Sequence, residues 1–160
     1  MKIELRARTE SHVRTYFART QDPEIQAMIP QTAKTVEEAV AQFEKTLLPG
    51  ATSFGRTVYA DGAYVGDVWC YCIDLQENPN AMISYCIFDK ALWGKGVATE
   101  AVKQFLEESL SRFGLKSVGA FAYCDNAASI RVLEKNGFEK REEFTDEGRL
   151  SVYYQKETTQ

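Results

Sequence analysis

The spacing of hydrophobic residues changes several times along the chain, and each change marks an expected secondary-structure element. Lys2–Arg6 alternates polar and apolar residues, which predicts a strand. Residues 9–30 predict one or two short helices, broken near Pro23 and ended by Pro30. Residues 35–50 contain a clearer helix signal, in which Thr35 can cap the start and Pro49-Gly50 are expected to stop the helix. Its apolar side consists of Val36, Val40, Phe43 and Leu47.

The middle of the chain has the period-two pattern of strands. Residues 54–60 and 63–75 flank Asp61-Gly62, a pair typical of a tight β-hairpin turn. Residues 81–88 form a nearly continuous apolar run. Such a run is expected of a central strand that is buried on both faces.

The second half of the chain returns to helical spacing. Apolar residues recur at that spacing from Val97 to Phe113, which predicts a helix of about four turns. Residues 116–124 predict another strand. A short helix follows, with Asp125 or Asn126 as its N-cap.

The order of these elements predicts the fold class. Strands cluster in the middle and at the end, where residues 138–144 and 149–157 predict a closing hairpin. A purely parallel α/β sheet is therefore disfavoured. We predict an α/β fold of the α+β type, with a mixed, mostly antiparallel central sheet flanked by helices on both faces. No repeat, linker or low-complexity tract interrupts the chain, so residues 1–160 are expected to form a single domain.

Composition narrows the expected cellular location and the possible binding partners. No apolar run approaches the roughly 20 residues needed to span a bilayer, and Met1–Thr9 lacks the apolar segment of a signal peptide. We therefore expect a cytoplasmic protein without membrane association. The net charge of −4 argues against a nucleic-acid partner, which would need a basic surface. The same charge is compatible with a cationic substrate such as an amine.

The cysteines do not indicate a metal site. Cys70 and Cys72 stand two apart on an expected strand and would share a face, and Cys86 and Cys124 follow. A metal site would need C-x-x-C pairs or added histidines. The single histidine, His12, is far away and is expected on a solvated helix face. We predict buried free thiols and no metal.

The triplet Gly94-Lys95-Gly96, just before the helix at Val97, indicates an anion-binding turn. Glycines let an anion approach the backbone, and a helix N-terminus favours negative charge. A Walker A loop is excluded because Gly96 follows the lysine, where serine or threonine is required. A dinucleotide fingerprint is weakened because Thr99 stands where a third glycine belongs. A plain strand-to-helix turn stays open as the alternative.

Two segments resemble the GNAT superfamily of N-acetyltransferases. Trp93–Ala98 fits that family's acetyl-CoA motif, [QR]-x-x-G-x-[GA], except at the first position. Tryptophan there, with the continuation GKG-x-AT-E-A, is similar to the RimJ/RimL branch, which acetylates protein N-termini and other primary amines. Residues 126–138 resemble the family's N-x-x-S-x-x-V-L-x-K-x-G-F segment. The expected order of elements is similar to the GNAT fold over essentially the whole chain.

The resemblance implies an acetyl-CoA site. The cofactor pyrophosphate would lie on the backbone amides of Gly94, Lys95, Gly96, Val97, Ala98 and Thr99. The pantetheine would pair with the central strand near Cys86, Ile87 and Phe88. Asn126 would both cap its helix and bind the cofactor.

The reaction implied is attack of a neutral primary amine on the thioester carbonyl, with a small molecule or a protein N-terminus as acceptor. The tyrosine that protonates the departing thiolate in much of the family is absent, because Leu133 stands there. In the RimJ/RimL branch a serine takes this role and Ser129 matches it, although serine is also common near a helix start. Asp67, Asp74 and Glu77 are candidate general bases, and solvated surface carboxylates are the alternative for each.

Two other functions stay open at this point. The missing tyrosine is compatible with a catalytically inactive acetyl-CoA-binding sensor or interaction module, and a purely structural domain would require both segments to be coincidental. Acceptor specificity is expected in residues 9–48 and in the last hairpin, which match no shared motif. The chain is expected to act as a monomer or a homodimer.

Overall fold

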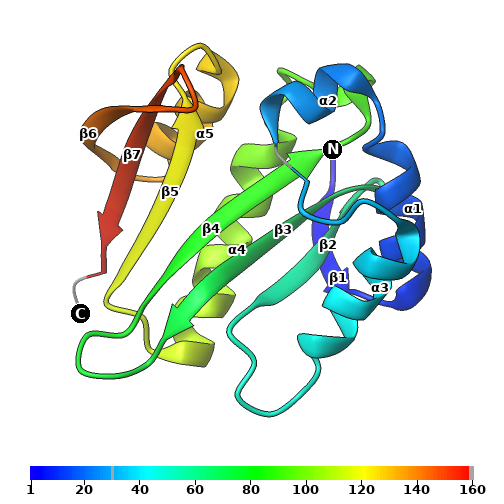
Figure 1. Ribbon diagram of the computed structural model, residues 1–160, viewed down its shortest axis with the longest axis horizontal. Coiled ribbons are helices and arrows are strands. Elements are labelled where there is room, and N and C mark those ends of the chain that lie inside the picture. Colours follow the sequence, from blue (N-terminus) through cyan, green and yellow to red (C-terminus); the bar gives the residue numbers. More distant parts are fainter. Residues whose placement is uncertain (30, 159–160) are drawn as a thin grey trace.

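The computed structural model describes residues 1–29 and 31–158, and its strands form one seven-stranded sheet in the order β1-β2-β3-β4-β5-β7-β6 (Figure 1). The strands are β1 (Ile3–Ala7), β2 (Phe54–Ala60), β3 (Ala63–Asp74), β4 (Asn80–Ile87), β5 (Ser117–Tyr123), β6 (Glu139–Asp146) and β7 (Arg149–Glu157). Neighbouring strands are antiparallel except β4 and β5. The predicted mixed, mostly antiparallel sheet is confirmed.

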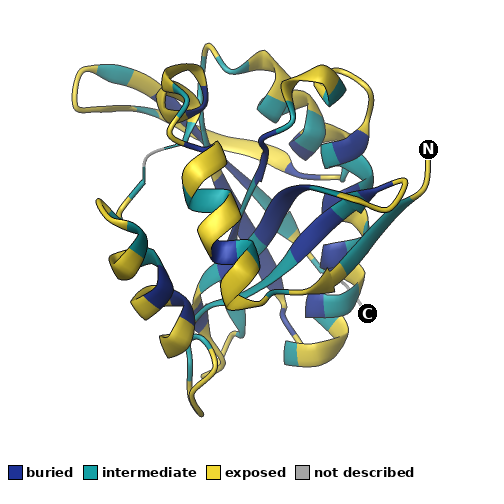
Figure 2. Cartoon of the chain, turned by 90° about the vertical axis from the view of Figure 1, so that its right-hand side faces the viewer, coloured by how far each residue is buried: buried dark blue, intermediate teal, exposed yellow. Residues whose placement is uncertain are grey.

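Helices cover both faces of the sheet, as predicted. They are α1 (Glu10–Arg19), α2 (Pro23–Met28), α3 (Val36–Lys45), α4 (Val97–Phe113) and α5 (Ala127–Lys135), with a short 3₁₀ turn η1 (Lys90–Leu92) before α4. Helix α4 passes behind β3 and β4 in Figure 1, and its Val102 and Phe105 are fully buried against the strands. Figure 2 shows the buried sheet between α4 and the helices of the N-terminal third.

Local turn and cap signals explain most element boundaries. Asp61 and Gly62 both have positive φ, +49° and +83°, as the tight β2–β3 turn requires. The predicted segment over residues 9–30 forms two helices, because Asp22 caps α2 and Pro23 occupies its first position. Pro30 lies outside the described residues.

One predicted boundary was wrong. Helix α3 ends at Lys45 and not at Pro49-Gly50, so Leu47 lies beyond the helix and is 66% exposed. Val40 and Phe43 alone of the predicted stripe are buried, where they pack against Val13 of α1. Helix α3 therefore covers α1 and not the sheet directly.

The prediction that Cys70 and Cys72 share a face was also wrong. Cys70 is buried, whereas Cys72 is exposed. The backbone takes a positive φ of 52° at Cys72, and the β3–β4 pairing shifts register between Tyr71 and Asp74. This irregularity interrupts the alternation on which the prediction relied. Of the other two thiols, Cys86 is buried and Cys124 is half-buried.

The sheet opens between its two parallel strands. β4 and β5 pair only from Asn80–Met82 to Ser117–Gly119 and then diverge, as Figure 1 shows. The Phe88 N–H donates to the Val65 carbonyl at 2.9 Å, so the even-numbered residues of β4 are those that exchange hydrogen bonds with β3. The backbone groups of residues 83, 85 and 87 therefore point toward the opening. Unpaired strand backbone thus borders the open part of the sheet.

Candidate functional site

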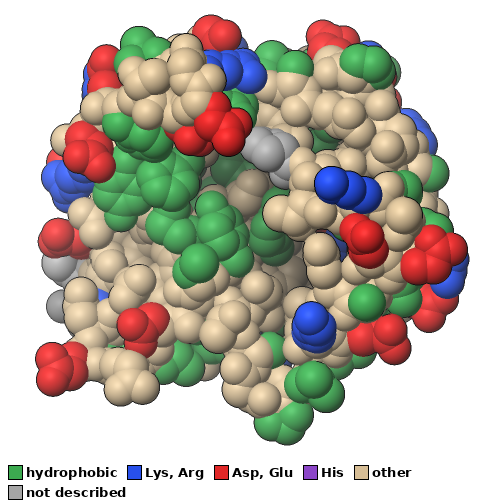
Figure 3. All heavy atoms as spheres, viewed as in Figure 1, with side chains coloured by type: hydrophobic (Ala, Val, Ile, Leu, Met, Phe, Trp, Pro, Cys, Tyr) green, Lys and Arg blue, Asp and Glu red, His purple; other side chains and the backbone are tan. Residues whose placement is uncertain are grey.

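A cleft of about 690 Å³ occupies the opening between β4 and β5. Figure 3 shows the hollow on the face of the molecule that carries α2. Its walls are formed by β4, the turn before α4, the outer side of α5, helix α2 and the β6–β7 hairpin. Of the segments where acceptor specificity was predicted, helix α2 and the last hairpin therefore reach the cleft.

The turn before α4 presents free backbone amides to the cleft. Gly94 and Gly96 have φ values of +77° and +83°, which glycine adopts without strain. Gly96 is the N-cap of α4 and has no side chain to satisfy the first turn. The first helical hydrogen bond joins the Glu100 N–H to the Gly96 carbonyl. The amides of Val97, Ala98 and Thr99 are therefore free of helical partners, which makes this end suited to an anion.

Trp93 ties this turn to the central strand. Its indole Nε1–H donates to the Ile87 carbonyl at 2.7 Å. The indole therefore occupies the Ile87 carbonyl that points toward the opening. The Ile87 N–H, which points the same way, keeps no strand partner there among the described residues. The sequence identifies Trp93 as a departure from the general motif and a likeness to the RimJ/RimL branch, but it does not predict this contact.

Most of the predicted site residues meet in the cleft. Those that line it are Cys86, Ile87, Gly94, Gly96, Val97, Ala98, Thr99, Asn126 and Ser129. Asn126 is the N-cap of α5, and its side chain accepts a hydrogen bond from the Ser129 N–H at 3.2 Å. The predicted N-cap is confirmed, and its contact with a cofactor stays a prediction.

Two predicted residues do not line the cleft. Phe88 directly follows β4, and its side chain is buried in a cluster with Ile25 of α2 and Cys86. Lys95 is exposed, and its N–H already donates to the Leu92 carbonyl at 3.3 Å inside the turn. Neither is part of the cleft lining, and the contact of each with a cofactor stays a prediction.

Ser129 has a partner that sequence analysis missed. The Ser129 hydroxyl lies 2.9 Å from the Tyr85 hydroxyl, which also donates to the Ser129 carbonyl at 3.0 Å. Tyr85 lies on β4 and Ser129 on α5, so this contact crosses the open part of the sheet. Burial raises the pKa of Tyr85 to about 12, so its hydroxyl stays protonated and can act as a donor.

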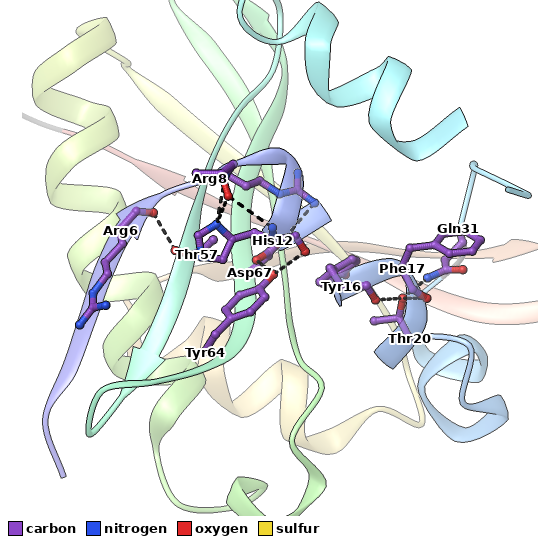
Figure 4. A network of polar contacts seen from close by, with 11 residues as sticks. Arg6, Arg8, His12, Tyr16, Phe17, Thr20, Gln31, Thr57, Tyr64 and Asp67 are labelled. Atoms are coloured by element: carbon purple, nitrogen blue, oxygen red, sulfur yellow. Dashed lines mark hydrogen bonds and ion pairs between the residues drawn. The ribbon is translucent and has the colours of Figure 1, made fainter. Parts of the chain in front are cut away.

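The candidate bases Asp67, Asp74 and Glu77 do not line the cleft, so their predicted placement was wrong. Asp74 and Glu77 are exposed. Asp67 is buried beside α1, where Figure 4 shows its network. It accepts a hydrogen bond from the Tyr64 hydroxyl at 2.6 Å and pairs with the Arg8 guanidinium at 2.9 Å.

Burial raises the pKa of Asp67 to about 6, against the opposing effects of Arg8 and Tyr64. The folded-state pKa of Asp67 lies above its ordinary value. The contribution of protonated Asp67 to the free energy of unfolding is therefore fully present at low pH. It is lost as the pH rises through about 6 and the buried carboxyl ionises. Above that pH the carboxylate depends on Arg8.

We expect Arg8→Met to destabilise the fold more at pH 8 than at pH 5.5. At the lower pH Asp67 is largely protonated and needs no counter-charge, whereas at pH 8 the variant buries an unpaired carboxylate or must keep it protonated. Urea unfolding at both pH values measures the difference. Arg14→Met is the control, because its pair with Glu10 is exposed and should contribute little at either pH. An equal loss at both pH values for Arg8→Met would contradict this account.

His12 does not lie on a solvated face as predicted. Its Nε2 is 2.7 Å from the Tyr59 hydroxyl, and its ring contacts Tyr64 edge-on with centroids 4.8 Å apart. The Thr9 N–H donates to Nδ1 at 3.1 Å. Partial burial and the nearby Arg8 lower the pKa of His12. His12 therefore anchors the start of α1 on the β2–β3 hairpin.

Comparison with known proteins decides the family. Residues 2–139 match the family model described as an acetyltransferase (GNAT) domain. The chain belongs to the GNAT acetyltransferase family. The resemblance of its two glycine-containing segments is thereby confirmed.

Individual relatives of this GNAT chain cover it only in part at the sequence level. The probable N-acetyltransferase YjcK of Bacillus subtilis is 36% identical over 87 residues, which are 54% of this chain and 48% of YjcK. The chain thus spans less than half the length of that curated relative.

Solved GNAT-like structures match the whole fold. The spermidine N-acetyltransferase of Vibrio cholerae, in complex with CoA and spermine, has a TM-score of 0.85 at 16% identity, covering 97% of this chain and 95% of the other. RimL, a ribosomal L7/L12 α-N-protein acetyltransferase in complex with coenzyme A, has a TM-score of 0.81 at 20% identity, covering 98% and 94%. At these identities the likeness establishes the fold.

Among the described residues, the structure contains no helix that is both long and apolar enough to cross a membrane.

Proposed function

We propose that this chain is an acetyl-CoA-dependent N-acetyltransferase that acts on a primary amine. The observation that carries the proposal is one cleft that joins three features. These are the uncapped N-terminus of α4, the unpaired edge of β4 and the Tyr85–Ser129 pair. Family membership supplies the chemistry that these features serve. We also propose that residues 1–160 form a single domain, which the single sheet supports.

The cleft provides for each part of acetyl-CoA. The free amides of Val97, Ala98 and Thr99, with those of Gly94 and Gly96, suit a pyrophosphate. Pantetheine carries amide groups, and the outward backbone groups of residue 85 and the carbonyl of residue 83 offer them strand-like partners. The acetyl carbonyl would then lie near the Ile87 N–H, which can stabilise the oxyanion that develops during attack.

The reaction moves the acetyl group from sulfur to nitrogen and takes one proton from the amine. The neutral amine nitrogen attacks the thioester carbon, the carbon–sulfur bond breaks, and the nitrogen gives up a proton while the sulfur gains one. The single Tyr85 hydroxyl proton lies within reach of both the Ser129 carbonyl and the Ser129 Oγ. When it turns from the carbonyl to Oγ, the Ser129 hydroxyl is released to donate its own proton to the departing sulfur, and Tyr85 can replace that proton. Water at the open mouth of the cleft can take the amine proton. An N-terminal α-amine, with a pKa near about 8, presents more neutral amine at pH 7 than a lysine does.

The cleft favours direct attack in a ternary complex over an acetyl-enzyme intermediate. Cys86 is the one cysteine among the described residues that line the cleft. Burial raises the pKa of its thiol to about 12, so little of the nucleophilic thiolate exists near neutral pH.

Two measurements test the proposed function. Acetyl-CoA at 100 times its dissociation constant should stabilise the fold by about 2.7 kcal/mol, which thermal unfolding detects. Release of free thiol from acetyl-CoA should then depend on an added primary amine. The absence of a thermal shift at saturating acetyl-CoA would reject the cofactor site. Binding without turnover across a broad amine panel would favour the inactive sensor instead.

We expect Ser129→Ala to lower kcat about 100-fold with little change in the KM for acetyl-CoA, because the hydroxyl acts mainly on the departing sulfur. Fold stability should change little, since the Asn126 cap uses the Ser129 backbone N–H and not its side chain. Tyr85→Phe should lower kcat less, and the double variant should resemble Ser129→Ala. Steady-state kinetics check this, and an unchanged kcat in Ser129→Ala would remove the role of the hydroxyl.

A further inference from the structure

The part of the cleft that faces α2 has an apolar and aromatic wall. The residues that form it are Ile25 and Met28 from α2, Ile29 directly after α2, Tyr71 from β3, Phe121 and Tyr123 from β5, and Phe144 from β6. Alternation separates this wall from the cofactor side. Ala120 and Ala122 of β5 belong to the main core, on the side of the sheet that α5 covers, so Phe121 and Tyr123 point to the opposite face of the sheet.

The apolar wall continues onto the surface beside the cleft. Phe121 is 54% exposed and packs against Phe144 and Tyr153, with ring centroids 5.6 and 5.3 Å apart. Figure 3 shows hydrophobic side chains gathered to the left of the hollow, over β5 and β7. A large exposed aromatic side chain at the edge of a cleft offers area to a bound apolar group.

The charges around the cleft disfavour a second cation on the acceptor. Asp146 is the one carboxylate among the described residues of the lining, whereas Arg131 and Lys135 contribute positive charge from α5. Arg149 lies at the rim, where its guanidinium pairs with the Asp125 carboxylate at 3.0 Å, so the two add little net charge. Its guanidinium lies over the Tyr123 ring at 3.5 Å and donates to the Ala27 carbonyl at 2.7 Å. A polyamine or aminoglycoside would bring several charges to a site that holds one carboxylate.

We infer that the acceptor of this site is a primary amine with a single positive charge, carried on an aromatic or branched aliphatic body. The inference rests on the proposed acetyltransferase function and names the substrate class of that same cleft. The aromatic wall holds the apolar body, and one ammonium group is matched by Asp146 and by the ring faces. Both a small arylalkylamine and a peptide N-terminus with an apolar first residue have this chemistry.

The first test compares acceptors at fixed acetyl-CoA. Thiol release should give a kcat/KM at least about tenfold higher for 2-phenylethylamine than for spermidine. A short peptide that begins with phenylalanine should likewise exceed the same peptide beginning with lysine. The larger of the two kcat/KM ratios identifies whether the natural acceptor is a small amine or a protein N-terminus. Either ratio above tenfold supports the inference.

The second test changes the wall. Phe121→Ala should raise the KM for the preferred aromatic acceptor about tenfold and leave the dissociation constant of acetyl-CoA unchanged. Leu150→Ala is the matched control, because Leu150 is 50% exposed on the adjacent hairpin and does not line the cleft. It should change neither value. Both side chains are exposed, so neither variant should unfold.

The outcomes separate the inference from the proposed function. A chain that binds acetyl-CoA and acetylates spermidine faster than the aromatic acceptors would overturn the inference and leave the proposed function standing. An unchanged KM in Phe121→Ala would also overturn it. A chain that neither binds acetyl-CoA nor releases thiol with any amine would overturn both.

Discussion

Gly96→Glu is expected to abolish acetyl-CoA binding while leaving the fold largely intact. Gly96 is the N-cap of α4 with a φ of +83°, and an added Cβ there would meet no atom within 4 Å. The substitution therefore costs about 1–2 kcal/mol of left-handed backbone strain and creates no clash. The new carboxylate would occupy the region where the first-turn amides favour an anion, and it would repel the cofactor phosphates.

Gly62→Glu separates this effect from strain. Gly62 has the same φ of +83° and the same open surroundings, but it lies in the β2–β3 turn outside the cleft. Calorimetric titration should show at least a 100-fold loss of acetyl-CoA affinity in Gly96→Glu and unchanged affinity in Gly62→Glu. Thermal unfolding should shift equally in the two variants. If Gly96→Glu kept full affinity, the pyrophosphate would not lie on this turn.

Much of the fold could be predicted because its signals are local. The Asp61-Gly62 turn, the helical spacing of Val97–Phe113 and the Asn126 cap each specify structure within a few residues. The order of these elements then leaves few topologies. The errors arose where a local rule is interrupted. A register shift separates Cys70 from Cys72, and a helix ended before the proline expected to stop it.

The site was predicted less completely, because its contacts join distant parts of the chain. The two glycine-containing segments located the turn before α4 and the start of α5. Tyr85, however, lies 44 residues from Ser129, and nothing near either residue signals the pair. Arg8 directly follows β1 and Asp67 lies on β3, so the two meet only after β1, β2 and β3 pair. The alternation of β4 did contain the information that Ile87 and Phe88 point to opposite faces.

We expect Gly66→Ala to be the most damaging small substitution near the site. Gly66 lies opposite Ile87 in the β3–β4 ladder. A Cβ at Gly66 would stand 2.2 Å from the Cys86 carbonyl oxygen and 2.9 Å from the Ile87 Cα. Both are backbone atoms, so the end of β4 must move. Because Ile87 carries the N–H proposed for the oxyanion and the carbonyl that holds Trp93, this shift should misalign the acetyl group.

A displacement of about 1 Å can cost about 100-fold in rate, and we expect a loss of that size in kcat/KM together with a lower melting temperature. Gly55→Ala is the matched control, because Gly55 is also a strand glycine but its Cβ would meet the Trp69 Cβ at 3.1 Å, a tight contact that needs a shift of only a few tenths of an ångström. Steady-state kinetics and thermal unfolding of both variants make the comparison. The effect of Gly66→Ala on stability can be separated from its effect on kcat/KM. If Gly66→Ala lowered stability as much as expected but kept full kcat/KM, the position of Ile87 would not control the reaction, and the oxyanion would have to be stabilised elsewhere in the cleft.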